Sequence, residues 1–151
     1  MAKPIITVII PAYNEEQSIG KVVDDIPRSV VDHVIVVNNN STDKTVEVAK
    51  NAGAIVLDEP RRGYGWACLK GIDHSKTLNT EIVVFLDGDY SDYPEEIPDV
   101  LAPIFEQDMD MVIGSRVLGK REKGSLTPQQ VFGNWLATRL IRLFYRARFT
   151  D

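Results

Sequence analysis

Short runs of β-branched residues alternate with segments of helical apolar spacing, and this alternation constrains the fold of the chain most strongly. Strands are predicted over residues 3–10, 33–37, 54–57, 81–86 and 109–114. Helices are predicted over residues 15–26, 63–76, 94–107 and 131–146, and one more between the N-cap candidates at 41–43 and Gly53. Proline at position 11 is expected to end the first strand, and Gly53 has the position of a C′ residue. Strands joined by helices of this length form βαβ units, so we predict an α/β fold with a mainly parallel, Rossmann-like sheet flanked by helices.

Length and composition fit one globular domain. The 151 residues are 44% hydrophobic and 26% charged, which excludes a disordered chain or a fibrous repeat. No apolar stretch approaches the ~20 residues that a membrane-spanning helix needs, and the first residues do not resemble a secretory signal. The single cysteine, Cys68, has no partner for an internal disulfide. We therefore expect a cytoplasmic location, at the cytoplasmic face of a membrane if the chain meets one.

Charge is divided unevenly along the chain. Residues 1–115 contain nine basic and twenty acidic side chains, a net charge of −11, whereas residues 116–151 contain eight and two, a net charge of +6. An acidic body suits divalent cations, while a basic end suits phosphates or an anionic membrane surface. The alternative is two solvated faces without a partner. Nucleic acid is not an expected ligand.

Four polar loops follow the predicted strands. In an open α/β sheet, ligands bind outside the carboxyl ends of the strands, so these loops are expected to share one edge. They comprise residues 11–16, 38–43, 58–65 and 87–92.

Asp87-Gly88-Asp89 directly follows the apolar run at residues 82–86. Two carboxylates with this spacing can hold Mg²⁺ or Mn²⁺, and these ions usually complete their coordination with substrate phosphates. An ordinary turn also explains the tripeptide, although Asp92, Glu95 and Glu96 add acidity that a turn does not require. The sequence thus favours a site for a metal and a diphosphate.

The other loops carry ambiguous signals. Tyr13 could stack on a nucleobase and a nearby glutamate could accept a ribose hydroxyl, but capping of the next helix explains most of the same residues. Arg61, Arg62 and Gly63 stand at a predicted helix start, where free N–H groups attract phosphate. This segment is not a dinucleotide fingerprint, because it follows the third strand and has cysteine in place of the last glycine. Arg116, after the fifth predicted strand, could neutralise a phosphate or be a plain surface arginine.

Residues 131–146 predict a basic amphipathic helix. Three arginines cluster near Trp135, beside a broad face of leucine and phenylalanine. Such a helix can lie in a membrane interface, where each basic residue near anionic lipid contributes about 1 kcal/mol. It can equally be a helix that packs on a core while its arginines reach solvent.

Taken together, four motifs resemble those of glycosyltransferase family 2, in the branch of dolichyl-phosphate mannosyltransferases and polyprenyl-phosphate glucosyltransferases. They are VIIPAYNEE at 8–16, VVNNNSTD at 36–43, FLDGD at 85–89 and GSR at 114–116, and the segments at 59–71 and 132–138 strengthen the similarity. The resemblance implies the GT-A nucleotide-sugar-binding fold. It also implies an inverting, metal-dependent transfer of a hexose from a UDP- or GDP-linked sugar to a polyprenyl phosphate or a related acceptor.

The resemblance further implies roles for particular residues. Asp87 and Asp89 would bind Mg²⁺ or Mn²⁺ as a DxD motif, and Arg116 would face the diphosphate or the acceptor. Asp151 corresponds to a carboxylate near the acceptor, which would act as a base if the acceptor were a sugar hydroxyl. The nucleotide-sugar site would be formed by Pro11, Tyr13, Glu15, Asn38, Asp43, Gly63 and Asp87. At position 38 this chain has asparagine, where the family usually has an aspartate that accepts a hydrogen bond from the nucleobase.

A division into two parts is expected on the same grounds. Residues 1–116 would form the nucleotide-sugar and metal-binding GT-A core, and residues 117–151 would begin an acceptor region that contains the basic helix. Family members continue beyond the Phe-Thr-Asp segment, so we expect a C-terminally truncated piece. Two other functions stay open: a nucleotide-sugar-binding module without turnover, and a nucleotidyltransferase, although the latter usually has a glycine-rich basic loop where this chain has Pro-Ala-Tyr-Asn-Glu.

Overall fold

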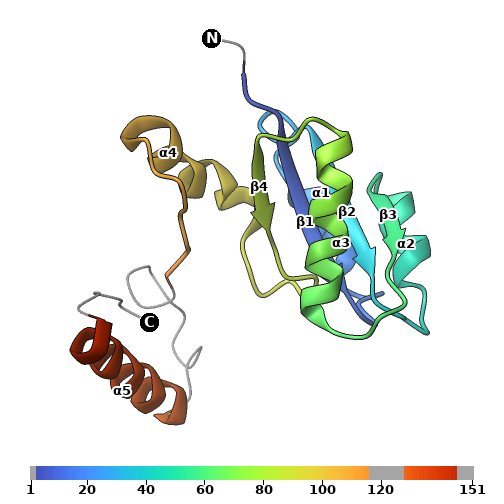
Figure 1. Ribbon diagram of the computed structural model, residues 1–151. Helices are drawn as coiled ribbons and strands as arrows, with labels where there is room; N and C mark the ends of the chain where they lie inside the picture. Colours follow the sequence, from blue (N-terminus) through green and yellow to red (C-terminus); the bar gives the residue numbers. More distant parts are fainter. Residues whose placement is uncertain (1–2, 116–127, 146–151) are drawn as a thin grey trace. The chain divides into compact units, whose positions relative to one another are not determined.

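The computed structural model describes residues 3–115 and 128–145 (Figure 1). The chain forms two compact units, Met1–Leu101 and Ala102–Asp151, and each is described by itself. The strands are β1 (Ile6–Ala12), β2 (His33–Asn38), β3 (Ile55–Asp58) and β4 (Ile82–Phe85). The helices are α1 (Ile19–Asp25), α2 (Thr45–Asn51), α3 (Tyr64–Thr77), the 3₁₀ turn η1 (Pro94–Glu96), α4 (Ile97–Gln107) and α5 (Pro128–Tyr145).

Among the described residues, the four strands form one parallel sheet in the order β3-β2-β1-β4. The register pairs Ile9 of β1 with Ile35 of β2 on one side and with Phe85 of β4 on the other. All seven residues of β1 are buried, as expected for a central strand covered on both faces. The predicted α/β class with a parallel sheet is confirmed.

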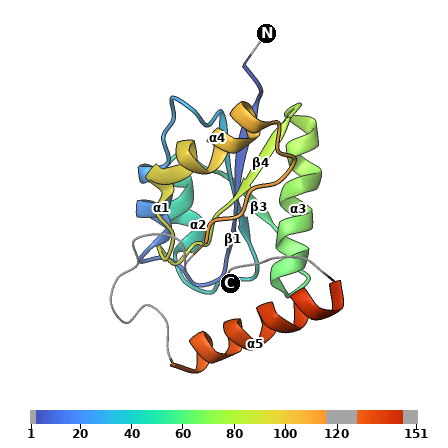
Figure 2. The same cartoon turned by 90° about the vertical axis from the view of Figure 1, so that its left-hand side faces the viewer.

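Helices cover both faces of this sheet. Helix α3 packs on β1 and β2, where its Ala67 joins a buried cluster with Ile9, Ile35 and Val37. Helices α1 and α2 pack on each other and lie on the opposite face, as Figure 2 shows with the strands between the two layers. Because strand side chains alternate between faces, odd-numbered residues of β1 and β2 face α3.

The first strand does not end at Pro11 as predicted, but continues to Ala12. Pro11 and Ala12 pair with Val37 and Asn38 of β2, whereas pairing with β4 stops at Ile9. The Ile9 carbonyl accepts from Leu86 N–H, so the backbone polar groups of Ile9 point toward β4. The backbone of Pro11, two residues later, points to the same side, beyond the residues that pair with β4. The missing N–H of proline therefore leaves no partner unpaired.

The first helix is shorter than its predicted range of 15–26 and begins at Ile19, after a loop that is bonded to its neighbour. Glu15 N–H donates to Thr45 Oγ1 at 2.7 Å, and Glu16 N–H donates to Asp43 Oδ2 at 3.1 Å. Asn14 adopts a left-handed φ of +57°. The bonds join the loop after β1 to the loop after β2, and residues 16–18 form a turn before helix α1 begins at Ile19.

The predicted strand at residues 109–114 is absent from the structure. Residues 109–115 form no helix or strand, and the side chains of Met111 and Ile113 are 72% and 69% exposed. A strand needs a neighbour that accepts its backbone hydrogen bonds, and the structure shows no such ladder for this segment. β-propensity alone therefore misled the prediction.

Helix α5 belongs to the second unit and carries an exposed apolar surface. Phe132 stacks on Trp135 with ring centroids 5.9 Å apart, and the Arg139 guanidinium lies 4.9 Å from the Trp135 ring centre. Leu143 and Phe144 are each 72% exposed. Within residues 3–115 and 128–145, no helix combines the length and the apolar character needed to cross a bilayer.

Candidate nucleotide-sugar site

A cavity of about 550 Å³ lies at the carboxyl edge of the sheet, between the ends of β1 and β4 and the first turn of α3. This volume falls within the usual range of small-molecule sites. The lining residues come from four segments that are far apart in the sequence: Pro11, Ala12, Tyr13, Glu15, Asn39, Arg62, Gly63, Tyr64, Ala67, Asp87, Gly88 and Asp89. Six of the predicted site residues are therefore brought together here, namely Pro11, Tyr13, Glu15, Gly63, Asp87 and Asp89.

The two carboxylates after β4 are held by a tight turn. Asp87 N–H donates to Asp92 Oδ2 at 3.2 Å, and Asp89 Oδ1 accepts from Ser91 N–H at 2.9 Å. Tyr90 has a left-handed φ of +64°, and its hydroxyl donates to Asp25 at the end of α1. The turn thus fixes the backbone on both sides of Asp89.

Gly88 lets this turn lie close to the end of β1. A Cβ atom at position 88 would be 3.4 Å from the Pro11 carbonyl oxygen and 3.4 Å from Glu15 Cγ. These are ordinary van der Waals distances, so the backbone at position 88 lies against the end of β1. The two carboxylates on either side of it line the same cavity as Tyr13 and Glu15.

Tyr64, the first residue of α3, has its hydroxyl beside the Asp87 carboxylate. Burial raises the pKa of its phenol to about 12, and the nearby Asp87 carboxylate contributes to this rise. The protonated hydroxyl donates to Asp87 Oδ1 at 3.4 Å. This bond uses one Asp87 oxygen and orients the side chain.

The carboxylates of Asp87 and Asp89 are hard oxygen donors of the kind that Mg²⁺ and Mn²⁺ prefer. Within the described part of the chain, no group of three or more His, Cys, Asp or Glu side chains is arranged to hold a metal ion. A cation beside Asp87 and Asp89 would need further oxygen atoms from water or from a bound ligand. That requirement fits a phosphate-bearing molecule in the same cavity.

Asn38 does not line this cavity, and Asn39 does. The Asn38 side chain donates to Asp58 Oδ1 at 2.8 Å and accepts from Ser41 N–H at 2.9 Å. Asn38 lies instead beside a smaller pocket of about 190 Å³. Alternate residues of a strand point to the same face of the sheet, and Ile35 and Val37 face α3. Asn39 is the next residue in this alternation, which could have identified it as the cavity residue.

Asp43 also lies outside the cavity lining. Its Oδ1 accepts from the backbone N–H and the hydroxyl of Thr45, and its Oδ2 accepts from Glu16 N–H. These bonds join the loops after β1 and β2. The nucleotide-binding role predicted for Asp43 stays a prediction. The contacts that Asp43 makes in the structure hold the two loops together.

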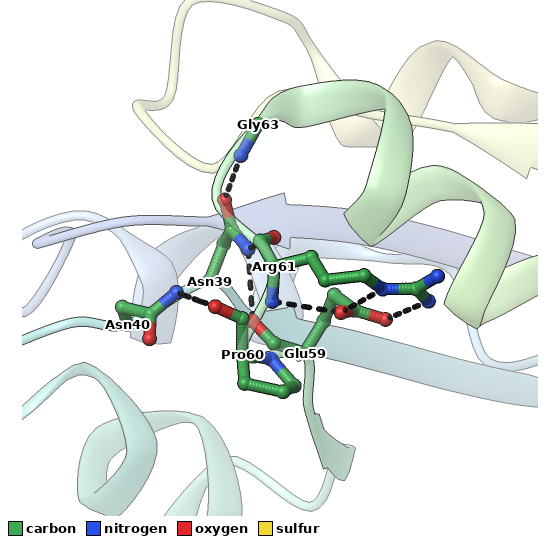
Figure 3. A network of polar contacts seen from close by, with 6 residues as sticks. All are labelled: Asn39, Asn40, Glu59, Pro60, Arg61 and Gly63. Atoms are coloured by element: carbon green, nitrogen blue, oxygen red, sulfur yellow. Dashed lines mark hydrogen bonds and ion pairs between the residues drawn. The ribbon is translucent and has the colours of Figure 1, made fainter.

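The two arginines before α3 have different surroundings. Arg61 forms a two-pronged ion pair with Glu59, with both N–O distances 2.7 Å (Figure 3). Its guanidinium lies 4.0 Å from the Trp66 ring centre. The side-chain and backbone bonds from Arg61 lower the pKa of the buried Glu59 carboxyl to about 2. Arg62 lines the cavity and was not among the predicted site residues, although the Arg-Arg-Gly segment had indicated a phosphate contact.

Two predicted catalytic residues, Arg116 and Asp151, lie outside the described residues. The same holds for the basic segment at residues 120–123. Their predicted roles stay predictions.

Comparison with known proteins identifies relatives of the chain. The family model described as "Glycosyl transferase family 2" matches residues 7–150. The chain is 33% identical over 153 residues to the low-salt glycan biosynthesis hexosyltransferase Agl6 of Haloferax volcanii, covering 98% of this chain and 36% of that protein. It is 29% identical to the UDP-N-acetylglucosamine–dolichyl-phosphate N-acetylglucosaminyltransferase of Methanococcus voltae, covering 89% of this chain and 61% of that protein. The chain thus spans about half the length of the curated relatives it matches.

A solved structure shares the fold. Glucosyl-3-phosphoglycerate synthase from Mycobacterium tuberculosis, in complex with Mn²⁺, UDP and glucosyl-3-phosphoglycerate, aligns with a TM-score of 0.61 and 31% identity. The alignment covers 68% of this chain and 40% of the synthase. The expected GT-A arrangement of a parallel sheet and flanking helices is confirmed by this likeness. The family model matches nearly the whole sequence, and the chain therefore belongs to glycosyltransferase family 2.

Proposed function

We propose that this chain binds a nucleoside diphosphate sugar and belongs to an inverting glycosyltransferase that moves a hexose to a polyprenyl phosphate. The observation that carries the proposal is the composition of the cavity. Two carboxylates from the end of β4 share it with an aromatic ring and a glutamate after β1, and with an arginine before α3. The aromatic ring and the glutamate suit a nucleoside, the arginine suits a diphosphate, and the two carboxylates suit a cation.

The nucleoside would lie toward the end of β1. Tyr13 lines the cavity and is 55% exposed, so its ring is accessible for stacking on a base. Glu15, whose backbone is fixed by Thr45, could accept a ribose hydroxyl. The solved synthase with the same fold is complexed with UDP, which supports a uridine donor, although GDP-linked sugars stay candidates.

Asp87 and Asp89 would hold Mg²⁺ or Mn²⁺ together with the donor diphosphate. Both side chains line the cavity, and each uses one oxygen in the hydrogen bonds described above, which fits a cation shared with phosphate. When bound, the cation would supply Lewis-acid stabilisation of the charge that develops on the leaving diphosphate. The synthase complexes with Mn²⁺ support this assignment.

The acceptor is proposed to be a polyprenyl phosphate, as the name of the Methanococcus voltae relative suggests for that enzyme. A phosphate monoester is largely ionised near neutral pH, so attack on the anomeric carbon needs no strong general base. Arg116 or the basic segment at residues 120–123 would then hold the acceptor phosphate. Asp151 would be required as a base only if the acceptor were a sugar hydroxyl.

We place this reaction at the cytoplasmic face of a membrane, with α5 as the contact. The exposed apolar surface of α5 lies beside Arg139 and Arg142, as in helices that bind an anionic interface. A polyprenyl acceptor would be reached at such a surface.

A transfer assay tests the proposal. The chain is incubated with Mn²⁺, polyprenyl phosphate in detergent and radiolabelled UDP-glucose, UDP-N-acetylglucosamine or GDP-mannose, and label is counted in the lipid phase. We expect lipid-linked label from one donor, and a decrease of about a hundredfold in Asp89→Asn, since a ligand to the cation is lost. Asp99→Asn, at an exposed aspartate of α4 outside the cavity, is the matched control.

Two results would change the proposal. Donor binding without transfer to any acceptor would indicate a nucleotide-sugar-binding module. Transfer that is equal in Asp89→Asn and the wild type would contradict the role of the Asp87–Asp89 pair.

A further inference from the structure

The amide of Asn39 ties the end of β2 to the loop before α3 (Figure 3). Its Oδ1 accepts from Gly63 N–H at 2.8 Å, and its Nδ2 donates to the carbonyls of Glu59 and Arg61 at 2.9 and 2.7 Å. One side chain therefore bonds to both ends of the loop at residues 59–63. We call these three bonds the Asn39 clamp.

The clamp depends on an amide group. Both Nδ2 bonds need a donor, and the Oδ1 bond needs an acceptor, so neither aspartate nor a hydroxyl side chain reproduces the set. Asn40 adds a weaker bond, from Nδ2 to the Pro60 carbonyl at 3.2 Å. Residues 59–63 form no helix or strand of their own, so their path depends on such side-chain bonds.

The two arginines of the clamped loop have different surroundings. The Arg61 side chain is engaged by the buried Glu59 carboxylate and by the Trp66 ring. Arg62 follows immediately, lines the cavity and makes no ion pair within the described part of the chain. It is the one cationic side chain among the described lining residues, in a cavity that also contains Glu15, Asp87 and Asp89.

We infer that Asn39 is a positioning residue that directs Arg62 into the cavity, where the guanidinium meets the diphosphate of the donor. This inference rests on the proposed function, because it requires a phosphate-bearing ligand in the cavity. Arginine binds phosphate oxygens with paired N–H donors, and a shift of the loop by one bond length would misplace them. Asn39 would therefore act through Arg62 and not through a contact of its own with the ligand.

Binding titrations followed by NMR chemical shifts test the inference on the 151-residue chain. The ligands are UDP and GDP with Mg²⁺, and the nucleoside of whichever binds more tightly. We expect Arg62→Ala to weaken the nucleoside diphosphate about tenfold and the nucleoside less than twofold, as for loss of one charge-assisted contact. Asn39→Ala is expected to weaken the diphosphate about fivefold. Arg28→Ala, an exposed arginine outside the cavity, is the matched control and should match the wild type.

The double variant separates positioning from other roles. If Asn39 acts through Arg62, Asn39→Ala combined with Arg62→Ala weakens the nucleoside diphosphate no more than Arg62→Ala alone, within twofold. Asn39→Asp retains the acceptor for Gly63 N–H and lacks both donors, so it serves as the second variant if Asn39→Ala fails to fold by circular dichroism. An effect in Asn39→Asp but not in a folded Asn39→Ala would indicate charge repulsion and would contradict the clamp.

The remaining outcomes are also decisive. A wild-type chain that binds neither UDP nor GDP would contradict the proposed function and with it this inference. A wild-type chain that binds one of them, with unchanged affinity in Arg62→Ala or in Asn39→Ala, would overturn the inference alone. Additive effects in the double variant would assign Asn39 a role independent of Arg62.

Discussion

Residue 71 has no room for a side chain, because helix α3 lies against β1 at this point. A Cβ atom on Gly71 would be 2.4 Å from Ile9 Cγ2, and Ile9 is completely buried in the cluster under α3. We predict that Gly71→Ala destabilises the chain by about 1–3 kcal/mol, since overpacking outweighs the usual gain of alanine over glycine in a helix. Urea unfolding measures the change.

Gly65→Ala is the matched control in the same helix. A Cβ atom there meets nothing within 4 Å, so alanine should leave stability unchanged or raise it by up to about 1 kcal/mol. Equal stabilisation by both substitutions would show that α3 and β1 are not in close contact.

Glu59 makes the stability of the chain depend on pH in the acid range. Because hydrogen bonds from Arg61 lower its pKa from 4.5 to about 2, the folded state binds a proton less readily than the unfolded state. The stabilisation is fully present above pH 4.5 and is lost as the pH falls toward 2. Glu59→Gln should reduce stability at pH 7 and should lose less stability than the wild type between pH 5 and 2.

Unfolding in urea at several pH values checks this prediction. The control is Glu81→Gln, a change of the same kind at an exposed glutamate before β4. Parallel stability curves for Glu59→Gln and the wild type would contradict the role of the Arg61–Glu59 pair.

At the residue scale, the sequence predicted six of the residues that line the cavity but not Asn39 or Arg62. Pro11, Tyr13, Asp87 and Asp89 follow strands whose ends meet at one edge, so their proximity could be predicted. The choice between Asn38 and Asn39 could not be made from residue type, because it depends on which face of β2 packs on α3.

At the scale of elements, strands were predicted correctly where a partner exists and wrongly where none does. The apolar run at 109–114 has the composition of a strand, but strand formation depends on pairing that a single sequence does not reveal. Strand β1 continues through Pro11 because pairing with β4 has already ended at Ile9, so no hydrogen bond is lost with the N–H that proline lacks. Helix α1 begins at Ile19, after a loop whose bonds to Asp43 and Thr45 a helical pattern does not reveal.

Helix α5 is expected to bind anionic membranes. Its exposed apolar side chains would enter the interface while Arg139 and Arg142 meet lipid phosphates, each contributing about 1 kcal/mol. We predict that the chain floats with vesicles containing phosphatidylglycerol, and that Arg139→Glu with Arg142→Glu lowers the bound fraction at least tenfold. Reversal of two exposed lysines elsewhere, Lys21→Glu with Lys50→Glu, is the matched control.

Two outcomes of the flotation experiment would contradict this assignment. The chain would stay in the lower fractions with anionic vesicles, or both charge reversals would lower binding equally. In the second case, vesicle binding would depend on the net charge of the chain and not on α5 in particular.

At the scale of the whole molecule, the acidic and basic parts of the chain coincide with different proposed partners. The acidic residues 1–115 include every described residue that lines the cavity, whereas the basic residues 116–151 include α5. The fold class was predictable from the alternation of strands and helices, and the family from four motifs, three of which stand at the ends of β1, β2 and β4. The proposed division at residue 116 stays a prediction, while compact packing in the structure divides at Leu101.

Calorimetric titration with UDP-glucose and GDP-mannose, with and without Mn²⁺, tests the central claim that the cavity binds a metal and a nucleoside diphosphate together. We predict that one donor binds, that Mn²⁺ raises its affinity at least tenfold, and that Asp89→Ala removes this dependence on Mn²⁺. Failure of both donors to bind, or binding that is the same without Mn²⁺ and in Asp89→Ala, would contradict the claim.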